Sequence, residues 1–315
     1  MPTFGATSAI LWAAKLMRHP LLLHSVSYAG LWGQAFLPID AFLAKAESLG
    51  YDGVMLMAKR PHVSPLDYGP AERAHLRAQL AKHNLDHNIL AGYCDLTTGL
   101  DRRDIPHKEI QLAYLKELCH LAHEIGVKTV RIFTGYESAH ASYPEQWNLV
   151  VDTLKEAARH AAEYDVVLGL QNHHDIGVGY EALHDILHTI DSPNLKALYD
   201  AWAPALQGVD IETAASKLAS HTVHTTIADY QLRPRYKYRP DLINYESQTP
   251  AVVAVPMGEG FIDYSLFLRA LKTHGFQGSI AYEMCSPLKG GGSLENLDLC
   301  AKRFLAWATE SHLCP

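Results

Sequence analysis

The amino-acid sequence predicts an α/β fold, a (β/α)8 TIM barrel formed by a single domain. Eight short runs of β-branched and aliphatic residues alternate with amphipathic stretches of helical period. Strand, helix and strand repeated in this way indicate a parallel sheet that closes on itself. No G-x-G-x-x-G motif follows any of the runs, so a doubly wound open sheet is the less favoured alternative.

The eight strand candidates are short apolar runs, most of which end in polar residues. In chain order they lie at residues 21–27, 53–58, 86–93, 129–135, 166–172, 195–201, 222–229 and 279–285. No repeat, low-complexity tract or Gly/Ser linker separates them. One barrel therefore covers residues 21–315, a length that this fold reaches as one domain.

The stretches between the strand candidates place apolar residues three and four positions apart, with charged residues on the other face, as amphipathic helices do. They cover residues 38–50, 69–84, 107–126, 146–165, 180–190, 211–220, 263–275 and 293–311. Pro38 and Pro70 suit the first turn of a helix, and Gly50, Gly126 and Gly275 suit its end.

Residues 1–20 are predicted to form a helical extension that precedes the barrel. The apolar segment 8–17 is interrupted by Lys15, is followed rather than preceded by basic residues, and is too short to span a bilayer. A remnant of a targeting segment is the less favoured alternative. No association with a membrane is expected.

The composition narrows the class of partner. The chain has 34 acidic residues against 27 Lys and Arg, a formal charge of −7, and no long basic run, which argues against a nucleic-acid partner. The five cysteines are scattered and form no C-x-x-C pair, which fits a reducing compartment. We expect a cytoplasmic protein that acts on a small molecule, and we expect it to form a homo-oligomer.

Two carboxylates stand where the active site of such a barrel is built, at the carboxyl ends of the strands. Asp200 in "ALYDAW" and Glu283 in "IAYEMC" each end an apolar run. A buried carboxylate is costly unless it is paired, hydrogen-bonded or metal-bound. A structural hydrogen bond to a loop is one explanation. The favoured one is a divalent cation such as Mn²⁺, Mg²⁺ or Co²⁺, held also by the amide oxygen of Gln171 and an imidazole nitrogen.

Further polar residues at the strand ends are candidate substrate contacts. They are Lys59, Arg131, Asn172 and Asp229, and a salt bridge or loop anchor is the alternative for each. The segment after the seventh strand, residues 230–250, interleaves arginines and a lysine with tyrosines. It is either a solvated loop or a lid that supplies cations, Lys237 among them, to the substrate.

Several segments of the chain are similar to those of one known superfamily. They are "ESLGYDGVMLM", "VRIFTG", "LGLQNH", "ALYDAW", "VHTTIAD", "PMGEGFIDYSLFLRAL" and "GSIAYEM". Over residues 20–310 the chain resembles the sugar phosphate isomerase/epimerase superfamily of xylose isomerase-like TIM barrels. Its members include ketose 3-epimerases, inosose isomerase and dehydratase, and 3-dehydroshikimate dehydratase.

The resemblance implies one divalent metal, held by Glu, Asp, His and Glu at the ends of the fifth to eighth strands. Asp200 and Glu283 match two of these positions, whereas the strand-five glutamate falls on Gln171 and the ligand histidine on Thr226. A histidine two residues before Thr226 on the same strand face, or one after strand five, is the candidate for the missing nitrogen. The predicted ligands are Gln171, Asp200, Glu283 and His224, with His174 as the alternative to His224, and Mn²⁺ is the preferred ion.

The resemblance also implies the chemistry. In epimerases of this superfamily, glutamates at strands five and eight exchange protons on opposite faces of the carbon next to a carbonyl. Gln171 cannot act as a base, which disfavours a two-base epimerisation. Glu283 would then remove the proton, and a histidine would protonate an oxygen or a leaving group. The candidate histidines are His173, His174 and His224.

We therefore predict a metal-dependent sugar isomerase or epimerase-like enzyme with a carbohydrate substrate. A lyase, a dehydratase or a keto-glycoside-cleaving enzyme on the same barrel is the alternative within enzymes. A noncatalytic sugar-binding barrel, or a subunit of a larger complex, is the alternative outside them.

Overall fold

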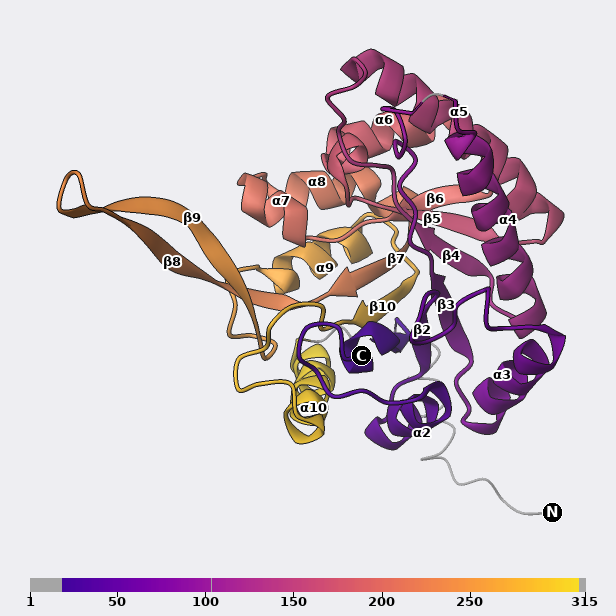
Figure 1. The fold of residues 1–315 in the computed structure, drawn as a ribbon. Coiled ribbons are helices and arrows are strands. Elements are labelled where there is room, and N and C mark those ends of the chain that lie inside the picture. The colour runs from indigo at the N-terminus through magenta and orange to yellow at the C-terminus, as the bar shows by residue number, and fades with distance from the viewer. Residues whose placement is uncertain (1–18, 103, 312–315) are drawn as a thin grey trace.

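Eight parallel strands close into a barrel in the computed structural model (Figure 1), which describes residues 19–102 and 104–311. The strands are β1 (Leu21–His24), β2 (Gly53–Met57), β3 (His87–Ala91), β4 (Thr129–Ile132), β5 (Val167–Gln171), β6 (Leu195–Leu198), β7 (Thr222–Ile227) and β10 (Ser279–Tyr282). Their order around the barrel is β1-β10-β7-β6-β5-β4-β3-β2. The predicted fold is confirmed, and each strand candidate contains one barrel strand. The predicted extension at 1–20 lies outside the described residues, except for its last two.

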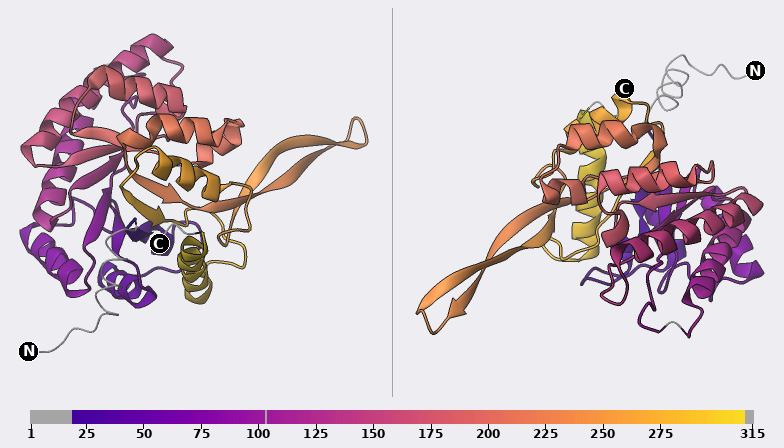
Figure 2. Two further views of the ribbon diagram at one scale, coloured as in Figure 1. Left: turned by 180° about the vertical axis from the view of Figure 1, so that it is seen from behind. Right: turned by 90° about the horizontal axis from the view of Figure 1, so that it is seen from above.

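Helices surround the barrel, as two further views show (Figure 2). They are α2 (Ile39–Leu49), α3 (Pro70–Lys82), α4 (His107–Ile125), α5 (Tyr143–Glu163), α6 (Tyr180–Ile190), α7 (Trp202–Gln207), α8 (Ile211–Leu218), α9 (Tyr264–Thr273) and α10 (Leu294–Glu310). Each predicted helix is present. Helix α5 begins earlier than predicted because Ser142 and Glu145 form a capping box. The short helix α7 was not predicted. None of the helices in the described ranges has both the length and the apolar character needed to cross a membrane.

The barrel interior changes from apolar to polar along the strands. Its lower layer is an apolar cluster of Leu22, Met55, Ile89, Ala91, Leu198 and Ala281. Because side chains alternate along a strand, the residue two positions further on faces the same interior. For Leu22, Leu198 and Ala281 that residue is His24, Asp200 or Glu283, respectively. The strand pattern itself therefore delivers ionisable groups to the carboxyl end of the barrel.

A long hairpin follows β7 in place of the predicted loop. Strands β8 (Asp229–Arg239) and β9 (Asn244–Val255) pair antiparallel along their length and extend away from the barrel as an arm (Figures 1 and 2). The register shifts between Arg233 and Arg235, on either side of Pro234. A proline within a strand removes a ladder hydrogen bond, so the sequence of this segment, for which a solvated loop or a lid is predicted, does not indicate a strand.

Candidate active site

A cavity of about 290 Å³ opens at the carboxyl ends of the barrel strands. This volume is close to the lower end of the range of about 300–1,000 Å³ that is typical of small-molecule sites. Aromatic rings form much of its wall, among them Trp32, Tyr93, Phe133, Tyr136, Trp202 and Tyr230. Its polar groups include His24, Arg131, Gln171, Asp200, Thr226 and Glu283. An apolar wall with a few convergent polar groups suits a small organic ligand.

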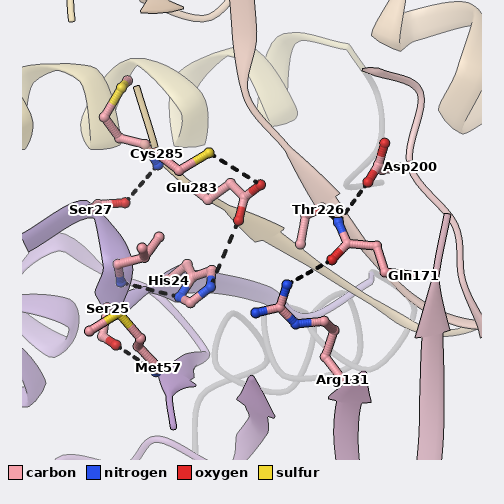
Figure 3. A network of polar contacts seen from close by, with 12 residues as sticks. His24, Ser25, Ser27, Met57, Arg131, Gln171, Asp200, Thr226, Glu283 and Cys285 are labelled. Carbon is pink, nitrogen blue, oxygen red and sulfur yellow. Dashed lines mark hydrogen bonds and ion pairs between the residues drawn. The ribbon is translucent and has the colours of Figure 1, made fainter. Parts of the chain in front are cut away.

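The side chain of Gln171 connects the positive and negative groups of the cavity (Figure 3). Its Oε1 accepts a hydrogen bond from Arg131 Nη1 at 3.0 Å. Its Nε2 donates to Asp200 Oδ2 at 2.7 Å and to Thr226 Oγ1 at 3.2 Å. A guanidinium only donates and a carboxylate accepts, so these partners fix which way the amide points. The amide oxygen is therefore the atom that accepts the hydrogen bond from Arg131.

Glu283 directly follows β10, and its side chain is 18% exposed. Its Oε2 lies 3.8 Å from His24 Nε2 (Figure 3). Burial raises the pKa of Glu283 to about 7, an effect that Arg131 opposes and Asp200 reinforces. Burial also raises the pKa of Asp200, to about 6. Both carboxyl groups therefore titrate close to neutral pH, where a side chain can both take up and return a proton.

Replacement of Glu283 by glutamine is expected to stabilise the protein at pH 8 and to leave its stability nearly unchanged at pH 4. The pKa of Glu283 is about 7 in the folded protein, above its usual value of 4.5. The folded state therefore holds this proton more tightly, and stability is lost as the pH rises from 4.5 through 7. Because the side chain is partly exposed, we expect a gain of about 1–2 kcal/mol. Urea unfolding at both pH values measures it, and an equal gain at pH 4 and pH 8 would contradict the assignment.

His173 and His174 lie together in the cavity wall. Their Nδ1 atoms are 2.7 Å apart, and the His174 ring stacks on Phe133 and Tyr136, with ring centroids 4.4 and 4.0 Å away. Burial lowers the pKa of each imidazole to about 4. Both rings are therefore neutral at pH 7, because their pKa values lie below the usual histidine value of 6.5. Either would donate a proton only as a neutral N–H.

His224 lies deeper in the barrel than the predicted metal position. Its side chain is fully buried, its Nδ1 lies 2.7 Å from Ser279 Oγ, and burial lowers its pKa to about 3. Thr226, two residues further along β7, lines the cavity instead. Since a strand rises about 3.3 Å per residue, His224 stands roughly 7 Å below it. The predicted ligands that reach the cavity wall are Gln171, Asp200, Glu283 and the alternative ligand His174.

Asn172 and Asp229 hold backbone in place. Asn172 Nδ2 donates to the carbonyl of Asp200 at 3.0 Å, and its Oδ1 accepts from the amide of the same residue at 2.8 Å. Asp229 Oδ2 accepts from the amides of Gly258 and Gly260, both at 2.9 Å. These contacts fit the loop-anchor alternative, and a contact of either residue with the substrate stays a prediction.

The two predicted lysine contacts differ in position. Lys59 lies in the cavity wall with its Nζ 3.9 Å from the centroid of the Tyr93 ring, and burial lowers its pKa. Lys237 is exposed on β8, opposite Glu246. Lys237 therefore lies away from the barrel mouth of its own chain, because β8 and β9 extend away from the barrel (Figure 1), and its contact with the substrate stays a prediction.

His24 and Trp202 are among the residues of the cavity wall that were not predicted from the sequence. His24 is the last residue of β1 and faces Glu283; the usable signal was a single ionisable residue at the end of the apolar run "LLLH". Trp202 begins α7 and stacks on Tyr230, with ring centroids 5.0 Å apart. No periodic pattern marks Trp202, because α7 is too short to show one.

A match to one family model over most of the chain identifies the family. A model described as a xylose isomerase-like TIM barrel matches residues 43–302, from α2 to α10. The chain belongs to the xylose isomerase-like TIM barrel family. The family resemblance inferred from the sequence is confirmed.

The individual proteins to which this chain is similar have low sequence identity to it. Fructoselysine 3-epimerase of Escherichia coli O157:H7 is 23% identical over 260 residues, which cover 80% of this chain and 87% of that protein. Inosose dehydratase of Geobacillus thermodenitrificans (strain NG80-2) is 25% identical over 142 residues, 44% of this chain and 47% of that protein. The structure of D-psicose 3-epimerase with D-tagatose from Clostridium cellulolyticum H10 has a TM-score of 0.71 and 15% identity, and the match covers 93% of this chain and 99% of that one. This likeness shows the shared fold.

The divalent metal that the resemblance implies does not fit the side chains of this cavity. The Gln171 oxygen, which would be one ligand atom, accepts a hydrogen bond from Arg131, and Thr226 stands at the histidine position. A dication bound to that oxygen would be repelled by the guanidinium charge. Within the described ranges, no three His, Cys, Asp or Glu side chains are grouped so as to hold a metal ion. The metal requirement stays a prediction, and the position of Arg131 disfavours it.

Proposed function

We propose that the protein is a carbohydrate isomerase of the sugar epimerase type, which moves a proton at the carbon next to a carbonyl. The names of the relatives, fructoselysine 3-epimerase and D-psicose 3-epimerase, support a sugar substrate and this class of reaction. The shape of the site supports a small, polar ligand, since polar groups stand within an aromatic wall.

The position of Glu283 carries the proposal. It is a largely buried carboxylate whose pKa of about 7 suits a base at neutral pH. In the proposed step its carboxylate takes the proton from carbon, and the electron pair of the broken C–H bond moves toward the carbonyl oxygen. His24 Nε2 lies 3.8 Å from the carboxylate, which is beyond hydrogen-bond distance.

A dehydratase is the second candidate, and Gln171 is the observation that favours it. An amide at the end of β5 cannot act as a second base, so the proton that Glu283 removes cannot be replaced from the opposite face by this residue. Loss of a hydroxyl from the next carbon would also follow from a single base. Inosose dehydratase among the relatives supports this alternative.

Proton exchange in D₂O tests the proposal. D-fructose, D-psicose, D-tagatose and an inosose are incubated with the protein, and ¹H NMR follows the signal of the hydrogen next to the carbonyl. Deuterium incorporation with an isomeric ketose as product supports the isomerase, and an unsaturated or dehydrated product supports the dehydratase. Absence of exchange with every keto-sugar and inosose would overturn the proposed function.

The compartment and the assembly are further parts of the proposal. The four cysteines in the described ranges are unpaired, which supports a cytoplasmic location. The exposed arm supports a homo-oligomer, because a two-stranded hairpin is marginally stable on its own. Its exposed apolar residues are Leu232, Tyr236, Tyr238, Leu242, Ile243 and Tyr245. Residues 230–254 contain four basic and two acidic residues, whereas the whole chain carries −7. A second copy of this acidic chain therefore suits the arm as a partner.

Replacement of Ile243 by asparagine is expected to shift the protein from oligomer to monomer. Ile243 is 82% exposed at the tip of the arm and has φ 47, a conformation that asparagine adopts more readily than a β-branched residue. The change therefore removes apolar contact area without straining the turn. Light scattering after size-exclusion chromatography measures the mass, with Leu66→Asn, at an exposed leucine outside the arm, as the control. A monomeric wild type would contradict the proposal.

A further inference from the structure

A fixed positive charge stands inside the cavity. Arg131 extends from β4 and is 4% exposed. Its guanidinium carbon lies 4.0 Å from the centroid of the Phe133 ring and 4.6 Å from that of the Tyr93 ring. Aromatic faces attract a cation and also restrict the plane of the guanidinium. The position of this charge is therefore set by the protein before any ligand arrives.

The guanidinium has hydrogen-bonding capacity left over. Nη1 donates to Gln171 Oε1, but Nε and Nη2 are buried without a hydrogen-bond partner among the described residues. A buried charged donor without an acceptor is costly, and such a group in a native structure needs an explanation. Because Arg131 lines the cavity, an acceptor that enters from solution would supply it.

Neither carboxylate of the cavity neutralises Arg131. The positive charge lowers the pKa of both Asp200 and Glu283 against the effect of burial, so it lies within electrostatic reach of both. No ion pair of Arg131 with either group occurs among the described residues, and Figure 3 shows the guanidinium directed to the amide of Gln171. The amide holds the guanidinium by one hydrogen bond and leaves its charge available.

We propose that Arg131 is the cation of this site: its Nε and Nη2 bind the substrate oxygen on which negative charge develops, and the reaction proceeds without a divalent metal. This inference rests on the proposed function. When Glu283 takes the proton, the C–H bond breaks, a C=C bond forms, and the carbonyl oxygen becomes an enolate oxygen. The two free N–H groups donate to that oxygen and to the adjacent hydroxyl. Glu283 then delivers the proton to the carbon that carried the carbonyl, while the proton of the adjacent hydroxyl moves to the enolate oxygen, so that the carbonyl forms on the adjacent carbon and the product is an isomer.

The same inference explains why a glutamine stands at position 171. A glutamate there would form an ion pair with Arg131 and neutralise the charge that the substrate oxygen needs. Glutamine has nearly the same shape, keeps the guanidinium in place and adds no charge. Gln171 is thus a positioning residue for Arg131.

Binding of oxalate tests the inference independently of any substrate. Oxalate is planar and presents two adjacent oxygens, as an enediolate does, so it can accept both free N–H groups. Calorimetry is carried out in excess EDTA on the full-length protein. We expect wild type to bind oxalate, Arg131→Met to bind it at least tenfold more weakly, and Arg159→Met, at an exposed arginine of α5, to bind it as wild type does. Equal binding by Arg131→Met, or binding that requires Mn²⁺, would overturn the inference.

A second variant guards against misfolding of Arg131→Met. Gln171→Glu is expected to fold, since the two side chains have nearly the same shape, and to weaken oxalate binding at least tenfold; unchanged binding would count against the inference. In the exchange assay, wild type treated with EDTA should keep its rate within twofold, and a rate that returns only with Mn²⁺, Mg²⁺ or Co²⁺ would overturn the inference. If wild type exchanges none of the sugars tested, the proposed function fails, while the oxalate result still decides the role of Arg131.

Discussion

Replacement of Glu283 by glutamine is expected to lower kcat for sugar proton exchange by a factor of about 10²–10⁴, the contribution of a positioned general base. Glutamine keeps the shape of the side chain and its ability to accept a hydrogen bond, but its amide does not take up a proton. Because the carboxylate acts on the proton in the transition state, while the proton is being transferred, the replacement should lower kcat and change KM little. Initial rates of deuterium incorporation, followed by ¹H NMR at several sugar concentrations, separate the two parameters.

The pH profile identifies which carboxylate is the base. For wild type, kcat should rise with pH and level off above about 7, because Glu283 must be ionised to accept a proton and its pKa is about 7. Glu109→Gln, at an exposed glutamate in the first turn of α4, is the control and should keep the wild-type profile. Full activity of Glu283→Gln would assign the base elsewhere, with Asp200, whose pKa is about 6, as the next candidate.

The barrel was predictable because each strand carries a local signal. All eight strands lie within short apolar runs, and amphipathic helices between them leave few alternatives to a closed parallel sheet. The arm was not predictable, because Pro234 and its charged neighbours are typical of a loop and its pairing depends on residues up to 26 positions apart, such as Asp229 and Val255. The β-propensity of individual residues does not indicate which distant residues pair.

The sequence predicts which residues end each strand and therefore which residues lie near the site. Asp200, Gln171 and Glu283 converge because parallel strands deliver their carboxyl ends to one edge. The depth of each side chain in the barrel and its hydrogen-bond partners were not predictable. His224 and Thr226 lie on the same face of β7, and only the barrel geometry shows that the second reaches the cavity. The reach of Arg131 from the neighbouring strand to the Gln171 oxygen depends on side-chain length and on the aromatic rings beside it.

Asp229→Ala is expected to lower the free energy of unfolding by about 3 kcal/mol, because three backbone amides lose their acceptor. The carboxylate is 2% exposed and accepts from Tyr230 at 3.0 Å and from Gly258 and Gly260 at 2.9 Å. Water can reach part of the loop once the side chain is removed, so the loss should be smaller than the full cost of three buried donors. Urea unfolding measures it, with Asp241→Ala at an exposed aspartate of the arm as the control, for which we expect a change within about 0.5 kcal/mol.

The kinetics of the same variant separate a loop anchor from a substrate contact. If Asp229 only holds the segment around Gly258 and Gly260, the folded fraction of Asp229→Ala at low temperature should keep KM within about threefold of wild type, since less than 1 kcal/mol of binding is then lost. Gly260→Ala should destabilise the protein in the same way, because a Cβ there would lie 1.7 Å from Asp229 Oδ1 and 2.6 Å from the carbonyl of Tyr230. An unchanged free energy of unfolding together with a tenfold higher KM would show that Asp229 binds the substrate. In that case the carboxylate, and not only Arg131, would contribute charge to recognition of the sugar.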